Sequence, residues 1–170
     1  MSWIQTYTGK RFFPLAPEPA DLDLRDVAHA LSLQCRFNGH CKGFYSVAEH
    51  SVRVSRALPE QYALWGLLHD AAEAYLSDLP SPVKRQMPLY QRAEATLLRV
   101  VASRFGLAWP MPEPVAQADL RLLATEARDL MAPPPEPWQL EAEPFGEPIE
   151  PWAPAEAERA FLARYAELRT

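Results

Sequence analysis

The sequence has little of what membrane proteins, disulfide-bonded proteins and nucleic-acid-binding proteins need. It contains no apolar run near the roughly 20 residues of a membrane span, and its N-terminus lacks a basic segment followed by an apolar one. Its two cysteines, Cys35 and Cys41, form no metal-type pair. The formal net charge of -5 argues against a general affinity for nucleic-acid polymers. We therefore expect a cytoplasmic protein that binds neither membranes nor nucleic-acid polymers.

The length and the apolar content fit one helical domain. A chain of 170 residues, nearly half of them apolar, can bury a real core, and it shows no internal repeat. Apolar residues recur at helical spacing through most of it. We predict an all-α bundle of about six helices with its core in residues 21–131. The expected helices cover residues 21 or 23 to 35, 46–58, 59–78, 90–105, 115–131 and 155–170, with a short helical stretch from Pro82.

Two segments lie outside this helical pattern. Residues 3–13 place short aromatic and β-branched runs on either side of Thr8-Gly9-Lys10, which predicts a small N-terminal β-hairpin lying on the helical body. Residues 132–154 hold eight prolines and five glutamates with no Lys or Arg, a composition that will not form a regular element. Because this segment also carries Trp138 and Trp152, we expect it to pack along the body of the same domain.

Ionisable residues interrupt the apolar helix predicted at 59–78. His69 and Asp70 point in neighbouring directions, and Glu73 lies about one turn further along the same side. The residues around them are apolar, so these groups are expensive to bury unless something binds them. A divalent metal is the simplest such partner.

Two other predicted helices supply further candidate ligands. Ser46-Val47-Ala48-Glu49 has the form of a capping box, so His50 falls near the start of the helix at 46–58. Asp119 falls in the first turn of the helix at 115–131. With the His-Asp pair they make a mixed nitrogen and oxygen set that suits one divalent ion, Mn, Co, Fe, Ni or Zn, with Mg also possible. Taken alone, Asp119 is better explained as a helix N-cap or a first-turn acid favoured by the helix dipole, and only the combined pattern favours a ligand.

The order His, then His-Asp, then Asp resembles that of the HD-domain metal-dependent phosphohydrolases. The likeness extends to the runs Ser46-Val47-Ala48-Glu49-His50-Ser51, His69-Asp70-Ala71-Ala72-Glu73 and Asp78-Leu79-Pro80-Ser81-Pro82-Val83-Lys84. Arg36-Phe37 sits where the 5′-deoxynucleotidase branch of that family has arginine followed by an aromatic residue. The same runs resemble the small phage enzymes of the family that remove triphosphate from dATP. The resemblance covers roughly residues 24–130.

The resemblance implies an HD-domain bundle that holds one divalent metal. The metal ligands that it implies are His50, His69, Asp70 and Asp119. Glu73 would orient or deprotonate the attacking water as a general base. Asp78 would position water or protonate the leaving oxygen. Both acids also have an explanation that involves no catalysis: Glu73 fits a surface acid, and Asp78 fits the end of a helix.

The resemblance also implies contacts with a substrate. Arg36 and Lys84 would hold phosphate oxygens by charge-assisted hydrogen bonds, and Phe37 would pack on the sugar or base. His40 and Lys42, in the loop that follows, are candidates for the rim of the pocket. The alternative for Lys84 is a solvated side chain, and for Arg36 and Phe37 a helix-end cation and a core aromatic residue. We expect His29, beside an apolar helical face, to be structural.

Three functions are compatible with the sequence. The first is hydrolysis of the 5′ phosphoester of 2′-deoxynucleoside monophosphates, and the second is release of triphosphate from a deoxynucleoside triphosphate. The third, from another class, is a regulatory protein that senses a nucleotide without turnover, but the intact ligand set and Glu73 argue against it. The expected partner is a small nucleotide in each case, and the resemblance implies a homo-oligomer.

Overall fold

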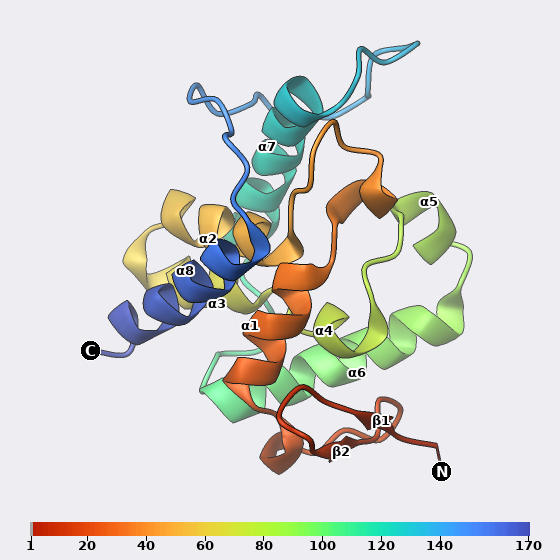
Figure 1. Ribbon diagram of the computed structural model, residues 1–170, viewed down its shortest axis with the longest axis vertical. Helices are drawn as coiled ribbons and strands as arrows, with labels where there is room; N and C mark the ends of the chain where they lie inside the picture. Colours follow the sequence, from red (N-terminus) through yellow and green to blue (C-terminus); the bar gives the residue numbers. More distant parts are fainter. Residues whose placement is uncertain (1) are drawn as a thin grey trace.

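The computed structural model of the protein describes residues 2–170 and is mostly helical (Figure 1). Within that range six helices have nine residues or more, in agreement with the predicted all-α class. They are α1 (Leu24–Leu33), α2 (Val47–Ala57), α3 (Glu60–Leu68), α6 (Pro88–Phe105), α7 (Glu113–Leu130) and α8 (Pro154–Glu167). Two four-residue helices, α4 (Glu73–Leu76) and α5 (Ser81–Lys84), lie between α3 and α6. None of the helices described is long and apolar enough to cross a membrane.

The predicted N-terminal hairpin is confirmed. Strands β1 (Ile4–Gln5) and β2 (Arg11–Phe12) pair antiparallel, and the turn between them uses Gly9 at a φ of +83°, a conformation that glycine adopts without steric cost. The hairpin lies on the helical body as expected (Figure 1). Phe12 is completely buried, and its ring stacks on that of Tyr75 in α4 with centroids 4.0 Å apart. This contact fixes the hairpin against the helices.

Helix α2 lies at the centre of the bundle and packs against α1, α3, α7 and α8. It approaches α3 closely because Gly66 has no side chain: a Cβ there would lie 2.6 Å from Cδ1 of Leu58 and 3.0 Å from Cα of Ser55. The Ser55 hydroxyl also donates to a backbone carbonyl of α3 at 2.8 Å. This close approach brings His50, on α2, near the end of α3, where His69 follows.

The single helix predicted at 59–78 is wrong, because α3 and α4 are separated by a turn over residues 69–72. Nδ1 of His69 donates to the carbonyl of Gly66 at 2.8 Å. In a continuous α-helix that oxygen would accept from the N–H of Asp70. Backbone bonds across the turn span three residues, as in the bond from the N–H of Glu73 to the carbonyl of Asp70 at 2.9 Å. That spacing keeps Asp70 and Glu73 on one side of the chain.

Two other boundaries differ from the prediction. Helix α7 begins at Glu113 with Pro114 in its first turn, where proline is well tolerated. Asp119 is therefore the seventh residue of α7 and lies in its second turn, so the first-turn explanation for this acid does not apply. Helix α1 begins after Asp23, which caps it as expected, but it ends before Cys35. Cys35 lies in an extended segment and not on the apolar helix face.

The capping box predicted for α2 is half formed. The Ser46 hydroxyl accepts from the N–H of Glu49 at 3.0 Å. The Glu49 carboxylate, however, accepts from Arg53 at 2.9 Å and from the N–H of Trp152 at 2.8 Å. Trp152 belongs to the proline-rich segment, which has no regular element over residues 132–153, as predicted. The bond to Glu49 therefore ties this segment to the helix that carries His50.

Candidate metal centre

Three side chains from three parts of the fold bring donor atoms together. His50 lies in α2, His69 follows α3, and Asp119 lies in α7. One ligand atom from each lies within 4.8 Å of the other two. Nε2 of His50 is 3.3 Å from Nε2 of His69 and 3.0 Å from Oδ1 of Asp119. The structure thus groups three of the four predicted ligands into a possible metal-binding site.

Asp70, the fourth predicted ligand, lies beside both histidines. Its Oδ2 is 3.2 Å from Nε2 of His69 and 3.6 Å from Nε2 of His50. The two imidazoles are buried, whereas the side chain of Asp70 is 20% exposed and that of Asp119 is 42% exposed. The histidine side of the centre is therefore closed, and its carboxylate side is open to solvent and to a ligand.

The second nitrogen of each imidazole is held by the protein. Nδ1 of His69 donates to the carbonyl of Gly66 at 2.8 Å, and Nδ1 of His50 donates to Oε1 of Glu126 at 2.6 Å. A neutral imidazole that carries its proton on Nδ1 has its lone pair on Nε2. Both Nε2 atoms therefore present lone pairs to the same point. Hydrogen bonds of this kind are the usual support for histidines that bind metals, so the residues fit an ion.

Protonation of the His69 ring competes with the binding of a metal ion. Burial disfavours a charged His69 ring, but the neighbouring Asp70 carboxylate outweighs this effect and raises its pKa to about 9. Burial likewise opposes ionisation of Asp70, yet the adjacent His69 holds the pKa of that carboxyl below its ordinary value. A histidine must lose its proton from Nε2 to bind a metal, so binding here releases protons.

Glu126 supports the centre and is absent from the predicted site. Its side chain is completely buried in α7. Besides the bond to His50, its Oε2 accepts from Nε and Nη2 of Arg36 at 3.2 and 2.9 Å. Burial alone would raise the pKa of this carboxyl, but the Arg36 and His50 charges hold it below its ordinary value. Glu126 follows Asp119 by seven residues, or two helical turns, and this spacing on one helix face is the signal that points to it.

Glu73 and Asp78 are two acids with unusual affinity for protons. Glu73 is buried, and its Oε2 has no hydrogen-bond partner among residues 2–170. Burial, reinforced by the charges of Asp70 and Asp78, raises its pKa well above the usual range. Burial also raises the pKa of Asp78, although the charge of Arg36 opposes the effect. Both predicted catalytic carboxyl groups therefore bind a proton more tightly than ordinary ones, so each is a stronger base when ionised.

Two predicted phosphate-binding cations border the centre, and both are paired. Nζ of Lys84 is 2.6 Å from Oε1 of Glu94 and 3.4 Å from Oε1 of Glu73. Nη1 of Arg36 is 3.8 Å from Oδ2 of Asp70, while its other nitrogens bind Glu126. The positive charge at the centre is therefore held in place by buried or half-buried acids.

The loop after Arg36 has an uncommon backbone. Phe37 and Asn38 have φ values of 55° and 51°, in the left-handed region that bulky residues rarely adopt. The Phe37 ring lies beneath the Arg36 guanidinium, 5.4 Å from its central carbon, and 6.1 Å from the Trp138 ring. Strain of this kind persists where the surroundings enforce it, often at functional sites. Phe37 thus lies next to Arg36, and its contact with the sugar or base of a substrate stays a prediction.

The two rim candidates, His40 and Lys42, lie in the loop that follows Phe37, and their place at a pocket rim stays a prediction. His40 is exposed, and its N–H bonds the carbonyl of Phe37 at 3.0 Å. Lys42 lies at the end of α7, where its Nζ donates to the carbonyl of Asp129 at 3.3 Å. Neither side chain contacts a predicted metal ligand in the part of the chain that the structure describes.

Comparison with known proteins gives relatives but no named activity. No protein-family model matches the chain. The chain is 42% identical over 171 residues to the uncharacterized protein YfdR of Escherichia coli, an alignment that covers 99% of this chain and 96% of YfdR. It is also 39% identical over 127 residues to an uncharacterized protein of Rhodobacter capsulatus, covering 69% of this chain and 65% of the relative. The chemistry of the site must therefore carry the functional argument.

Proposed function

The chain belongs to the same family as YfdR of Escherichia coli, and we propose that it is a divalent-metal-dependent phosphohydrolase of the HD-domain type that removes the 5′ phosphate from 2′-deoxynucleotides. One observation carries the proposal: the lone pairs of His50 and His69 converge with a carboxylate oxygen of Asp119, within 4.8 Å of one another. The hydrogen bonds on the other ring nitrogens favour this convergence over an accidental cluster.

The donor set supports one ion held by four residues. His50, His69 and Asp119 supply three donors, and Asp70 lies close enough to both rings to supply the fourth. Two imidazoles with two carboxylates suit Mn, Co, Fe, Ni or Zn, and Mg is the less favoured occupant. A bound ion of this class lowers the pKa of a water and offsets the charge of a phosphate.

Glu73 is the group that we assign to the attacking water. Its Oε2 lacks a protein partner, so that oxygen is available to a water molecule. Lys84 lies 3.4 Å from its Oε1 and helps to orient the carboxylate. The water oxygen forms the new bond to phosphorus while Glu73 accepts the proton, and a position one turn from Asp70 gives the required reach.

Asp78 is the group that we assign to the leaving oxygen. As the bond between phosphorus and O5′ breaks, the oxygen needs a proton to leave as a neutral nucleoside hydroxyl. The half-buried carboxyl of Asp78 holds its proton more tightly than an ordinary aspartic acid and is near the charges of both Glu73 and Asp70. It therefore fits a proton donor.

The pairing of the two predicted phosphate-binding cations favours a monophosphate over a triphosphate. Arg36 and Lys84 are both engaged by acids, and Lys42 lies at the end of α7. A triphosphate carries more negative charge and would require further cations, so triphosphate release is the second candidate. The free oxygen of Glu73 favours turnover over a sensor that only binds a nucleotide.

Product analysis tests the proposal. Metal-stripped protein reloaded with Mn²⁺ or Co²⁺ is incubated with deoxynucleoside mono- and triphosphates and their ribose counterparts, and the products are separated by chromatography. We expect nucleoside and phosphate from the deoxynucleoside monophosphates. Nucleoside with intact triphosphate would establish the second candidate instead. Metal binding without turnover of either set would reject both. The expectation of a cytoplasmic homo-oligomer that binds no nucleic-acid polymer stays a prediction.

A further inference from the structure

A cavity lies between the N-terminal hairpin and helices α1 and α4, apart from the proposed metal centre. Its volume is about 340 Å³, enough for a small organic molecule. Figure 1 shows the hairpin lying across the end of the molecule where α1 begins. The lining residues that carry the argument are Tyr7, Asp26, His29, Ala30, Ala74 and Tyr75.

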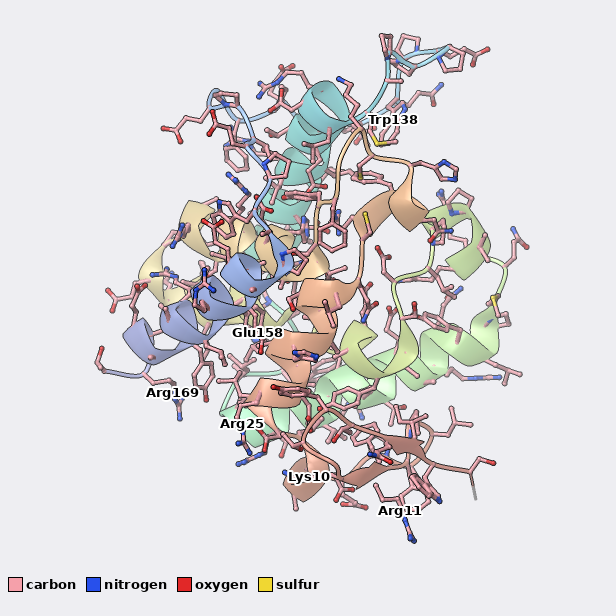
Figure 2. The ribbon with its side chains drawn as sticks, in the orientation of Figure 1. Lys10, Arg11, Arg25, Trp138, Glu158 and Arg169 are labelled. Carbon is pink, nitrogen blue, oxygen red and sulfur yellow. The ribbon has the colours of Figure 1, made fainter. Side chains whose placement is uncertain are left out.

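Asp26 is a buried carboxylate that forms no ion pair with a cation among residues 2–170. The residue is only 2% exposed. Its two oxygens accept from the N–H of Thr8 at 2.6 Å and from the Thr8 hydroxyl at 3.0 Å, and both donors are uncharged. The nearby Lys10 and Arg25, labelled in Figure 2, pair with Asp23 at 3.2 and 3.0 Å. A buried carboxylate is costly unless a charge offsets it.

Tyr75 lines the same cavity, and its hydroxyl is buried next to it. The residue is 8% exposed, and its hydroxyl makes no hydrogen bond to any residue in 2–170. Its ring is fixed by the stack on Phe12. Buried hydroxyls are nearly always hydrogen-bonded, so one without a protein partner beside a cavity points to a polar ligand.

Tyr7 and His29 provide an aromatic wall. Their rings stack with centroids 3.7 Å apart and planes inclined by 13°. Nδ1 of His29 lies 3.1 Å from Oε2 of Glu158, which adds a second carboxylate on this side (Figure 2). Aromatic faces attract organic cations, and the surrounding acids reinforce that preference. The stack with His29 holds the Tyr7 ring in place.

We propose that this cavity binds a small organic cation, an amine, amidine or guanidine, whose charged head pairs with Asp26 while its body lies against the stacked pair of Tyr7 and His29. A metal ion fits poorly, because the described residues group three metal-ligating side chains at the His50 centre and not here. The inference does not depend on the proposed hydrolase activity. It does place the ligand against Ala74 and Tyr75, in the helix that also presents Glu73.

Benzamidine and its neutral analogue benzamide test the proposal. Both are planar and similar in size, but benzamidine alone carries a positive charge. Each is titrated into the full-length protein, and binding is followed by the backbone amide signals in nuclear magnetic resonance. We expect benzamidine to shift the signals of Thr6, Ala30 and Ala74 and benzamide to leave them unchanged. Equal binding of the two, binding elsewhere or no binding of benzamidine would overturn the proposal.

Two variants locate the site. Asp26→Asn keeps an oxygen for the N–H of Thr8 but removes the charge. Benzamidine should therefore bind this variant at least about tenfold more weakly than the wild type. Glu60→Gln, an exposed carboxylate on α3, is the matched control and should bind normally. If Asp26→Asn fails to fold, Ala30→Leu serves instead, because it fills the cavity and leaves Asp26 intact. Benzamidine binding that survives Ala30→Leu would contradict the assignment.

Discussion

The carboxylate of Glu126 accepts a hydrogen bond from Nδ1 of His50 at 2.6 Å, and both side chains are completely buried. This bond sets the tautomer of a proposed metal ligand, and the same carboxylate anchors Arg36. A single residue of α7 therefore couples the metal centre to the cation that we assign to phosphate binding.

Replacing Glu126 tests that coupling. Glu126→Gln keeps the side-chain shape but removes the charge that holds His50 and Arg36. We expect metal affinity to fall by about 10- to 100-fold, the usual cost of losing a group that orients a metal ligand. Calorimetric titration of stripped protein with Mn²⁺ measures it. Glu113→Gln, at the exposed start of the same helix, is the control. An unchanged metal affinity in Glu126→Gln would contradict the role of Glu126 in orienting His50.

Removing the metal should destabilise the protein. An ion that binds only the folded state adds about 2.7 kcal/mol to the free energy of unfolding at 100 times its dissociation constant. We expect EDTA to lower the Tm of the wild type, and we expect His69→Ala to show no such response because a donor is lost. His40→Ala removes an exposed histidine and should respond like the wild type. An EDTA response that persists in His69→Ala would argue against this centre.

Glu73→Gln separates catalysis from metal binding. The amide cannot accept the proton of the attacking water, so turnover should fall by about 10² to 10⁴-fold. Metal stoichiometry should stay unchanged, because Glu73 is not among the proposed ligands. Glu94→Gln removes the other acid that holds Lys84 and leaves Glu73 in place, so it should retain most of the activity. Activity kept in Glu73→Gln would reject its role as the base.

Gly66→Ala should destabilise the fold. Alanine normally favours a helix over glycine by up to about 1 kcal/mol. Here the added Cβ would lie 2.6 Å from Leu58 and 3.0 Å from the backbone of Ser55, so we expect a net loss of about 1–3 kcal/mol. Urea unfolding gives the difference. Gly43→Ala, where a Cβ meets nothing within 4 Å, should be close to neutral. A stabilised Gly66→Ala variant would show that α2 and α3 separate easily.

Asp129 should make stability depend on acid pH. Hydrogen bonds from Arg128 and from the N–H of Ile149 hold its pKa below the ordinary value. The unfolded state therefore binds the proton more tightly, and the stabilisation is present above about pH 4, the unfolded pKa, and lost as the pH falls through the folded pKa. The difference in unfolding free energy between wild type and Asp129→Asn should shrink from pH 6 to pH 3. A difference independent of pH would exclude this contribution.

Local sequence signals predicted much of the fold. Ser46 predicted the start of α2 and with it the position of His50, because an N-cap hydroxyl acts on the adjacent turn. Asp23 did the same for α1. The proline-rich composition of residues 132–154 predicted an irregular segment. Its predicted packing holds for Ile149, which is buried, but not for Trp138, which is 41% exposed. These features depend on neighbours along the chain, which a sequence displays directly.

Side-chain hydrogen bonds and ion pairs explain what the sequence did not predict. The helix at 59–78 is interrupted because the His69 ring takes the carbonyl of Gly66, a side-chain choice that a helical pattern does not contain. Glu126 is paired with Arg36, 90 residues away, and that pairing exists only after folding. Lys84 is similarly held by Glu94, so its charge is less free than its motif suggested.

The bond from the N–H of Trp152 to Glu49 has a consequence for biosynthesis. Every proposed metal ligand precedes residue 120. The hydrogen bond to Glu49, the residue before His50, comes from Trp152, and α8, which packs on α1 and α2, lies later still in the chain. As the ribosome makes the chain from its N-terminus, all four ligands emerge before their support. We expect a nascent chain that stops at residue 131 to hold its ion loosely, so metallation follows the end of translation.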